Sequence, residues 1–578
     1  MSVIGIGDSH DSGCALVDNG MVLSALNEER FTKNKNEVGF PYKSLRYLKE
    51  SQNMDEVQAV ALAWIGGNAL ISRMIPSWDR KRRDLWRRAV PKPSRPSMHL
   101  TNGIYKLIQN QRPRALWKAV GVPISSSITS KRLGNVSKEL SHKKVYAVEH
   151  HLAHASSAYY PSGFKEALII TLDGAGDGLS GTVSIGDKGK ITRLAEFRAS
   201  TSIGIMYGAA TVACDMRYSE DEGKLMSLAA YSYPKEIKEL ERICRYDSRK
   251  KTLVSDTGTR NELLLAEYMK DHILSKNDRE SFAYAMQMHV QNQVLAIVKQ
   301  WVAETGLRNV AVSGGFFSNV ITNMLIEQLP EVKNLFIFPQ MGDGGLPYGA
   351  ACYIDFMLNG ALNAKQIQTI YFGPSYQDAE ISQSIKDGRK RMKLDVSEVK
   401  DPAKEAAHII TKEKKVILWF QGGMEYGPRA LGNRSVLAIP NDQHSRDTIN
   451  MIIKKRPYYQ PFASSVLEVD AKKLFTDYVA PNRFMTSANH LKEDYYDDMV
   501  AAAHVDHTTR PQILGKENRL YRDLILEVKK STGIGAVLNT SLNKHGKPMA
   551  MSPEDAIWTL ENTGADTLVI GNYVVRKK

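Results

Sequence analysis

Two histidines four residues apart, His150 and His154, stand in the polar segment "VEHHLAHASSAYY". On a helix this spacing puts both imidazoles on one face, as in enzymes that bind one cation through two histidines. Asp173 ends the next apolar strand and Asp343 stands in a later glycine turn, so these carboxylates can complete a His2Asp2 shell. Such donors suit zinc, iron or manganese better than calcium. His151 points elsewhere by the same helical geometry.

The elements that carry these residues follow an order that occurs twice along the chain. The first copy reads strand "SVIGIG", loop "DSHDSG", strand "CALVD", turn "DNG" and strand "MVLSAL"; the second begins "EALIITL", "DGAGDG", "GTVSIG". Asn-Gly between apolar strands predicts a hairpin. Two further glycine turns follow, "SGGFF" and "GDGGLPYG", and the spacing in "ESFAYAMQMHVQNQVLAIVKQWV" predicts a helix. Glycine turns let backbone N–H groups reach phosphates. We predict an α/β fold, a duplicated ATPase of the actin/hexokinase type.

Length and composition favour a globular protein of two or three domains, because 578 residues exceed one ordinary core. Hydrophobic residues make up 43% and charged residues 24%, which excludes a disordered chain. We expect no signal peptide, because the first apolar run is short and lacks a basic flank, and no membrane-spanning segment. The cysteines form no CxxC pair, which favours free thiols in a reducing cytoplasm. They are Cys14, Cys214, Cys244 and Cys352.

A basic stretch, "SWDRKRRDLWRRAVPKPSRPS", accounts for much of the net charge of +14. Trp78, Trp86 and Trp117 lie in it or near it. Basic and aromatic residues together are found at nucleic-acid interfaces and on anionic membrane surfaces. A solvated helical cap is the favoured interpretation. Contact with a membrane surface, or with an acidic or lipid-linked substrate, stays open.

The C-terminal part contains a basic constellation within shaped Gly-Pro-Arg and Pro-Phe loops. Guanidinium groups fork onto phosphate oxygens, and lysine adds a point charge. The segment "VLNTSLN" follows a strand and can present hydroxyl, amide and backbone N–H groups to an anion. The pattern predicts a pocket for a small phosphorylated molecule. Its candidate residues are Arg429, Arg434, Lys454, Arg456, Arg510, Asn539, Ser541 and Asn543.

Four motifs carry a resemblance to a known family. The segments "HHLAHASSAYYPSGF…LDGAGDG", "EGKLMSLAAY", "WFQGGMEYGPRALGNRS" and "LNTSLNKHGKPMAMSPEDA" resemble the O-carbamoyltransferases of antibiotic and nodulation-factor biosynthesis. The likeness spans nearly the whole chain apart from a basic insertion at about 66–135. It implies an N-terminal domain like the tRNA threonylcarbamoyl-transferring enzymes, over 1–360, and a linker over 361–375. It also implies a C-terminal domain of YrdC type over 376–578.

The resemblance also implies a reaction. Carbamoyl phosphate is cleaved to carbamate, ATP converts it to carbamoyladenylate, and the carbamoyl group passes to a hydroxyl of a small-molecule acceptor. His150, His154, Asp173 and Asp343 match the family's iron-type ligands, so ATP and Fe2+ are the implied cofactors, with Mg2+ a further candidate beside ATP. The candidate catalytic residues are His10, Lys224 and Arg429. The candidate ATP and carbamoyladenylate ligands are His10, Gly174, Asp177, Lys224, Gly314, Gly315, Asn319 and Asp343.

Two departures from the family pattern concern the pocket rim. Lys547 stands where the family has an acidic residue, and Gln460 where it often has arginine. Two alternative functions are a tRNA threonylcarbamoyladenosine enzyme and a nucleotide-sensing regulator. A third, a hydrogenase-maturation carbamoyltransferase, is disfavoured because the sequence has no zinc-finger CxxC pairs. No nucleic-acid partner is expected. The acceptor and the oligomeric state, a homodimer included, are not determined by the sequence.

Overall fold

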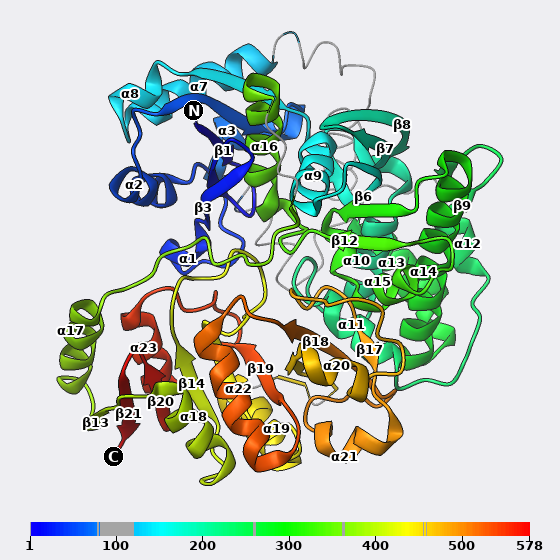
Figure 1. Ribbon diagram of the computed structural model, residues 1–578. Coiled ribbons are helices and arrows are strands. Elements are labelled where there is room, and N and C mark those ends of the chain that lie inside the picture. Colours follow the sequence, from blue (N-terminus) through cyan, green and yellow to red (C-terminus); the bar gives the residue numbers. More distant parts are fainter. Residues whose placement is uncertain are drawn as a thin grey trace. The chain divides into compact units, whose positions relative to one another are not determined.

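The computed structural model describes residues 2–77, 80, 119, 121–257, 262–360, 365–454, 456–457 and 459–578. The chain divides into two compact units (Figure 1). Unit 1 comprises residues 1–28 and 36–367, and unit 2 comprises residues 29–35 and 368–578. The division after residue 367 falls inside the predicted linker, whereas no sequence pattern predicted that residues 29–35 belong to unit 2. Trp78, Trp86 and Trp117, with most of the basic stretch, lie outside the described residues.

The first sheet of unit 1 has the strand order β3-β2-β1-β4-β5. β1, β2 and β3 are antiparallel, whereas β1, β4 and β5 run parallel. Asn19 and Gly20 have φ values of 48° and 76°, which fits the predicted Asn-Gly hairpin. The strands are β1 (Ser2–Gly7), β2 (Gly13–Asp18), β3 (Met21–Asn27), β4 (Val57–Ala63) and β5 (Lys144–Val148).

The second sheet repeats this topology. Its order is β12-β11-β6-β7-β8, with β6, β7 and β8 antiparallel and β6, β11 and β12 parallel. The structure therefore confirms the predicted duplication of an α/β half of the actin/hexokinase type. The strands are β6 (Glu166–Gly176), β7 (Leu179–Asp187), β8 (Lys190–Arg198), β11 (Asn309–Ser313) and β12 (Asn334–Ile337), and a separate ribbon pairs β9 (Arg245–Asp247) with β10 (Thr252–Val254).

Helices cover these sheets and bring the two copies together within unit 1. α16 lies against both α9 and β1, and two glycines allow the close approach (Figure 1). A Cβ at Gly5 would come within 1.8 Å of the Pro347 carbonyl oxygen, and one at Gly349 within 1.9 Å of the Ala153 carbonyl oxygen. The helices are α2 (Tyr42–Ser51), α3 (Gly67–Met74), α7 (Val122–Gly134), α8 (Lys138–Ser141), α9 (His150–Tyr159), α10 (Ile203–Ala213), α11 (Glu222–Ala229), α12 (Glu239–Ile243), α13 (Glu262–His272), α14 (Arg279–Thr305), α15 (Val320–Glu327) and α16 (Leu346–Asn359).

The predicted helix of the second half is α14, whose apolar face is buried as its spacing indicated. Phe282, Met286, Val290, Val294 and Ile297 are fully inaccessible to solvent. Within the described residues, none of the helices combines the length and the apolar run needed to span a bilayer.

Unit 2 is built on a mixed sheet of order β13-β21-β20-β14-β15-β19-β16-β18-β17. Apolar side chains from both faces of this sheet are buried under helices. Its α/β character fits the expectation, and the likeness to the YrdC type stays a prediction. The strands are β13 (Leu394–Glu398), β14 (Ile417–Phe420), β15 (Arg434–Ala438), β16 (Ala463–Leu467), β17 (Asn489–His490), β18 (Thr508–Leu514), β19 (Ala536–Ser541), β20 (Thr567–Ile570) and β21 (Tyr573–Lys577).

The helices of unit 2 include one short segment from the N-terminal part of the chain. α1 (Glu29–Thr32) leads into Lys33, which pairs with Asp555, and Arg30 donates to the Gly427 carbonyl oxygen at 2.8 Å. The other helices are α17 (Asp378–Arg389), α18 (Pro402–Thr411), α19 (Gln443–Thr448), α20 (Glu468–Leu474), α21 (Tyr496–Met499), α22 (Arg519–Thr532) and α23 (Pro553–Asn562), with a π-helical turn at Ile449–Lys454.

Candidate functional site

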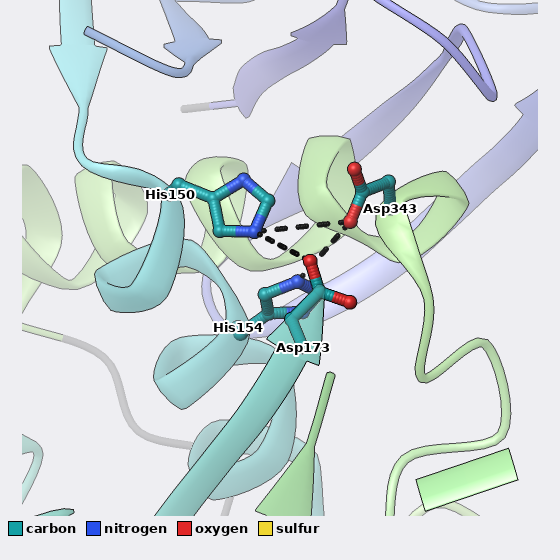
Figure 2. Close-up of side chains that lie close together, drawn as sticks. All are labelled: His150, His154, Asp173 and Asp343. Atoms are coloured by element: carbon teal, nitrogen blue, oxygen red, sulfur yellow. Dashed lines mark hydrogen bonds and ion pairs between the residues drawn. The ribbon is translucent and has the colours of Figure 1, made fainter. Parts of the chain in front are cut away.

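The four predicted metal ligands meet in unit 1 (Figure 2). His150 and His154 lie one turn apart on α9, Asp173 lies on β6, and Asp343 precedes α16. One ligand atom from each residue lies within 4.8 Å of the others. His150 Nε2 is 3.3 Å from Asp173 Oδ2, and His154 Nε2 is 3.4 Å from Asp343 Oδ1. The predicted juxtaposition is therefore present.

The donor atoms of this cluster fit a cation. His154 Nε2 and Asp343 Oδ1 are buried, and apart from their 3.4 Å contact with each other neither atom is hydrogen-bonded within the described residues. Two imidazole nitrogens with two carboxylates form a set that transition metals bind. His154 is oriented through its other nitrogen, since Nδ1 lies 3.3 Å from Ser313 Oγ. His151 instead directs Nδ1 to Thr171 Oγ1 at 3.0 Å, which agrees with its predicted place outside the donor set.

Charge is concentrated at the cluster. Burial alone would lower the pKa of His150, but the carboxylates of Asp343 and Asp173 outweigh it and raise that pKa to about 9. Burial would raise the pKa of Asp343, but His10 and His150 hold it well below its usual range. Burial and the charge of His150 lower the pKa of His151 to about 3. Without a metal, a proton on His150 thus partly balances the two carboxylates.

A cavity of about 300 Å³ opens beside the cluster and contains most of the predicted nucleotide ligands. Glycine backbone, carboxylates and aromatic rings line it, a combination that suits a nucleotide. Of the predicted nucleotide ligands it contains His10, Gly174, Gly315, Asn319 and Asp343, and Asp173 of the predicted metal ligands also lines it. The further lining residues are Asp11, Ala175, Gly204, Tyr207, Tyr218, Ser219, Glu222, Gly223, Met226, Glu262, Phe316, Ser318 and Gly342.

His10 joins this cavity to the metal cluster. Its Nε2 lies 2.9 Å from Asp343 Oδ2 and its Nδ1 lies 3.0 Å from Asp11 Oδ2. The side chain is 19% exposed, so a ligand in the cavity can reach the ring. His10 is thus placed to orient Asp343, and its ring faces the cavity.

Three predicted nucleotide ligands lie elsewhere among the described residues. Asp177 accepts hydrogen bonds from the backbone N–H groups of Ile65, Gly66 and His150. Its carboxylate thus fixes the first residue of α9. Lys224 pairs with Asp221 at 2.8 Å and does not line the cavity.

The third, Gly314, contacts β6, because a Cβ there would lie 2.1 Å from the Leu172 carbonyl oxygen. Glu222 and Gly223, not singled out from the sequence, face the cavity in place of Lys224. The signal that identifies them is their place in the first turn of α11, whose N-terminal residues face the cavity.

Unit 2 contains the predicted basic constellation, and three of its arginines form a cluster. Burial lowers the pKa of Arg429 to about 10 and that of Arg456 to about 9. Burial and the charges of Arg429 and Arg456 hold the pKa of Arg510 well below its usual range. Arg510 Nε is buried without a hydrogen-bond partner in the described structure. Cations that face one another in this way are suited to bind an anion.

Lys454 and the "NTSLN" residues lie next to this cluster. Burial and the charge of Arg456 lower the pKa of Lys454. Its ammonium group donates to Ser541 and to the Asn543 side chain. The Asn539 side chain donates to the Ala430 carbonyl oxygen at 3.2 Å and so supports the loop that carries Arg429.

Arg434 differs from the other arginines because its donors are already used. The guanidinium donates to carbonyl oxygens of Gln421, Gly422, Pro374 and Met551 and packs on Phe420, 3.7 Å from the ring centroid. Arg434 therefore organises the loop rather than offering free donors.

Glu425, not predicted, supports the same loop. One carboxylate oxygen accepts from the backbone N–H groups of Leu431, Asn433 and Arg434. Its position four residues before Arg429 in "MEYGPRALGNRS" is the sequence signal that could have identified it.

Comparisons with known proteins identify the family of this chain. A family model described as the carbamoyltransferase N-terminus matches residues 2–352, and one described as the carbamoyltransferase C-terminus matches residues 407–577. The chain belongs to the carbamoyltransferase family. It is a carbamoyltransferase enzyme by this membership, as the motifs predicted.

Relatives of this carbamoyltransferase match along its length. An uncharacterized protein of Methanocaldococcus jannaschii is 30% identical over 97% of this chain and 93% of its own. The nodulation protein NolNO of Sinorhizobium fredii is 28% identical over 98% of this chain and 79% of its own. Among solved structures, full-length HypF in the phosphate- and nucleotide-bound form has 14% identity and a TM-score of 0.35. That match covers 63% of this chain and 47% of the other, so this chain spans about half the length of HypF.

Proposed function

We propose that this carbamoyltransferase uses ATP and carbamoyl phosphate to form a carbamate ester on a hydroxyl group of a small-molecule acceptor. Sugars, glycolipids and other natural products are the acceptor classes. The observation that carries the proposal is the presence of two different sites on one chain: a His2Asp2 cluster beside a cavity of about 300 Å³, and a group of partly buried arginines whose charges act on one another.

The arginine cluster suits the first half of the reaction. Arg429, Arg456 and Arg510 bind the phosphate group of carbamoyl phosphate, and water cleaves this mixed anhydride to carbamate and inorganic phosphate. Lys454 holds Ser541 and Asn543 at the side of Arg456. Because carbamate is short-lived in water, keeping both sites on one chain favours its capture.

The cavity of unit 1 suits the second half. A carbamate oxygen attacks the α-phosphorus of ATP and releases pyrophosphate, which gives carbamoyladenylate. The acceptor hydroxyl oxygen then attacks the carbamoyl carbon, AMP leaves, and His10 receives the hydroxyl proton. Gly174, Gly315 and Asn319 line the cavity that would hold the nucleotide.

His150, His154, Asp173 and Asp343 would hold Fe2+ beside this nucleotide. A bound metal ion supplies Lewis-acid polarisation of a phosphate oxygen. Lys224 and Gly314 stay predictions for contacts with the nucleotide.

Transfer of radiolabel from carbamoyl phosphate to a panel of sugars, glycolipids and polyketides, with ATP and Fe2+, tests the proposal. We expect His154→Ala to lose metal and transfer while it keeps phosphate release from carbamoyl phosphate. Arg510→Gln is expected to lose phosphate release, and Arg519→Gln, at a side chain 93% exposed, serves as control.

Three results would count against the proposal. Full activity and metal content in His154→Ala would show that the metal assignment is wrong. Wild-type protein that binds ATP but releases no phosphate from carbamoyl phosphate would favour a nucleotide sensor. Labelling of bulk tRNA in the presence of threonine would favour the tRNA-modifying alternative.

A further inference from the structure

Trp64 has a backbone conformation that large side chains rarely adopt. It follows directly after β4, and its φ is +78°. For a bulky residue this is an outlier, and such outliers cluster at functional sites. The residue is only 5% exposed and does not line the cavity described above. A role other than contact with a ligand in that cavity must therefore account for the conformation.

Hydrogen bonds hold this conformation from both sides. The Trp64 N–H donates to the Val148 carbonyl oxygen at 2.9 Å, and its own carbonyl accepts from Arg73 Nη2 at 3.2 Å. The next two N–H groups, of Ile65 and Gly66, donate to Asp177 at 3.0 and 2.6 Å. The backbone of Trp64 is thus fixed by contacts to β5, α3 and the β6–β7 turn.

Arg73 connects the same corner to the loop that carries His10. Its side chain is completely buried, with Nε 2.9 Å from Asp8 and Nη1 3.0 Å from Ser125 on α7. Nη2 also reaches the Ala63 carbonyl oxygen at 2.7 Å. The positions of Trp64 and of the loop 8–12 are therefore linked through one guanidinium group.

The indole ring of Trp64 meets two functional imidazoles edge to face. Its centroid lies 4.4 Å from that of His150, at an interplanar angle of 83°, and 5.6 Å from that of His10, at 79°. Such contacts are favourable and directional. They orient one metal ligand and the ring that pairs with another, Asp343.

Among the described residues, His150 Nδ1 meets no partner for the hydrogen bond that usually orients a metal-binding histidine. The second nitrogen of such a ligand normally donates to a carboxylate, carbonyl or water. His154 follows this rule through Ser313, whereas His150 Nδ1 is buried with no partner among the described residues. Gly176 also contacts the ring, because a Cβ there would lie 2.1 Å from His150 Cγ. Contacts with the Trp64 ring and with Gly176 thus restrict the orientation of the His150 ring.

We propose that Trp64 is a positioning residue that sets the ring orientations of His150 and His10 by aromatic contact. This inference rests on the metal centre of the proposed function. The strained backbone places one aromatic edge against both imidazoles.

Titration of the purified full-length protein with Co2+ alone, followed by its visible absorption, tests this inference. Removal of an orienting group near a metal typically weakens affinity by about 10- to 100-fold. We expect Trp64→Leu and Trp64→Gly to weaken Co2+ binding by about tenfold or more and to change the absorption band. Glycine suits a φ of +78°, so that variant removes the ring without backbone strain.

Trp64→Phe tests the same point with a smaller perturbation, which matters if the other variants fail to fold. Its smaller ring should give an intermediate result, with about threefold weaker Co2+ binding. Trp301→Leu, at a buried tryptophan on α14, is the matched control and should leave affinity and band unchanged. Wild-type affinity and band in Trp64→Phe and in the folded Leu or Gly variant would overturn the inference.

The outcomes separate this inference from the proposed function. If His154→Ala also binds Co2+ normally, the metal centre itself is wrong. If His154→Ala loses Co2+ while the Trp64 variants bind it like wild type, only the role of Trp64 is refuted.

Discussion

Two arginines of the same "GPRALGNR" segment should affect stability in opposite directions. Burial lowers the pKa of Arg429 to about 10, and at about 1.4 kcal/mol per pKa unit this corresponds to roughly 3 kcal/mol against its charged form. Because the side chain keeps some exposure, we discount this to about 1–2 kcal/mol. Arg429→Met keeps the apolar stem and removes the charge, so it should stabilise the ligand-free protein by that amount.

Arg434→Met, in contrast, should destabilise the protein. The guanidinium of Arg434 donates to carbonyl oxygens that are buried with it, those of Gln421 and, at 3.3 Å, Met551. Removing the guanidinium takes this donor from both carbonyls, at about 1–3 kcal/mol for each buried group that stays unsatisfied. We expect a loss of about 3 kcal/mol, with the cation–π contact to Phe420 contributing.

Urea unfolding of the full chain, with and without inorganic phosphate, measures both effects. A ligand at a hundred times its dissociation constant stabilises the folded state by about 2.7 kcal/mol, so the wild-type protein should gain on this order in saturating phosphate. The Arg429→Met variant should gain much less stability from saturating phosphate than the wild-type protein does. The reasoning is refuted if Arg429→Met is less stable than wild type without phosphate, or if its gain with phosphate equals that of wild type.

Three further predictions concern single contacts. Gly349→Ala should destabilise the protein by about 1–3 kcal/mol in urea unfolding, since its Cβ overlaps the Ala153 carbonyl oxygen; Gly223→Ala, whose Cβ meets nothing within 4 Å, should not destabilise it. Glu425→Gln should weaken phosphate binding in a thermal-shift titration, because it loosens the loop at Arg429. The control Glu413→Gln, at an exposed glutamate that pairs with Arg576, should leave phosphate binding unchanged. The hydrogen bond to Asp477 raises the pKa of His490; burial would raise the pKa of Asp477, but His490 lowers it. The pair of His490 and Asp477 therefore contributes its full share of the folding stability between roughly pH 4 and 6.5. This contribution is lost as the pH rises through the raised pKa of His490 or falls through the lowered pKa of Asp477. Asp477→Asn should destabilise the protein by about 0.5 kcal/mol at pH 5.5 and by less at pH 9.5, where only the hydrogen bonds from the His490 backbone N–H and the Asn489 side chain remain; an equal loss at both pH values would contradict the assignment.

The meeting of the four predicted metal ligands could be predicted because its sequence signals are local. The spacing of His150 and His154 needs only the helical period, and Asp173 and Asp343 stand at strand ends and glycine turns that duplicate one fold. The duplication could also be predicted, because the periodicity of the sequence indicates the order of strands and hairpins.

What the sequence could not predict depends on side-chain direction and on distant partners. Lys224 and Glu222 are two residues apart on one helix, and only packing decides that the glutamate faces the cavity. Arg429 and Arg434 share a motif, but the carbonyl oxygens around Arg434 come from several separate segments. The contact between Trp64 and His150 depends on strand pairing between β4 and β5, which no local pattern encodes.

The short segment 29–35 has a consequence for how this protein is made and divided. Unit 2 contains Arg30 and Lys33, whose partners Gly427 and Asp555 are synthesised much later. During translation α1 must wait for most of the chain before its contacts can form, so unit 2 is completed last. A gene fragment that begins at residue 368 encodes an incomplete unit. The chain therefore crosses between its units at three places, and a mutation in this early segment is expected to act on the late-folding half.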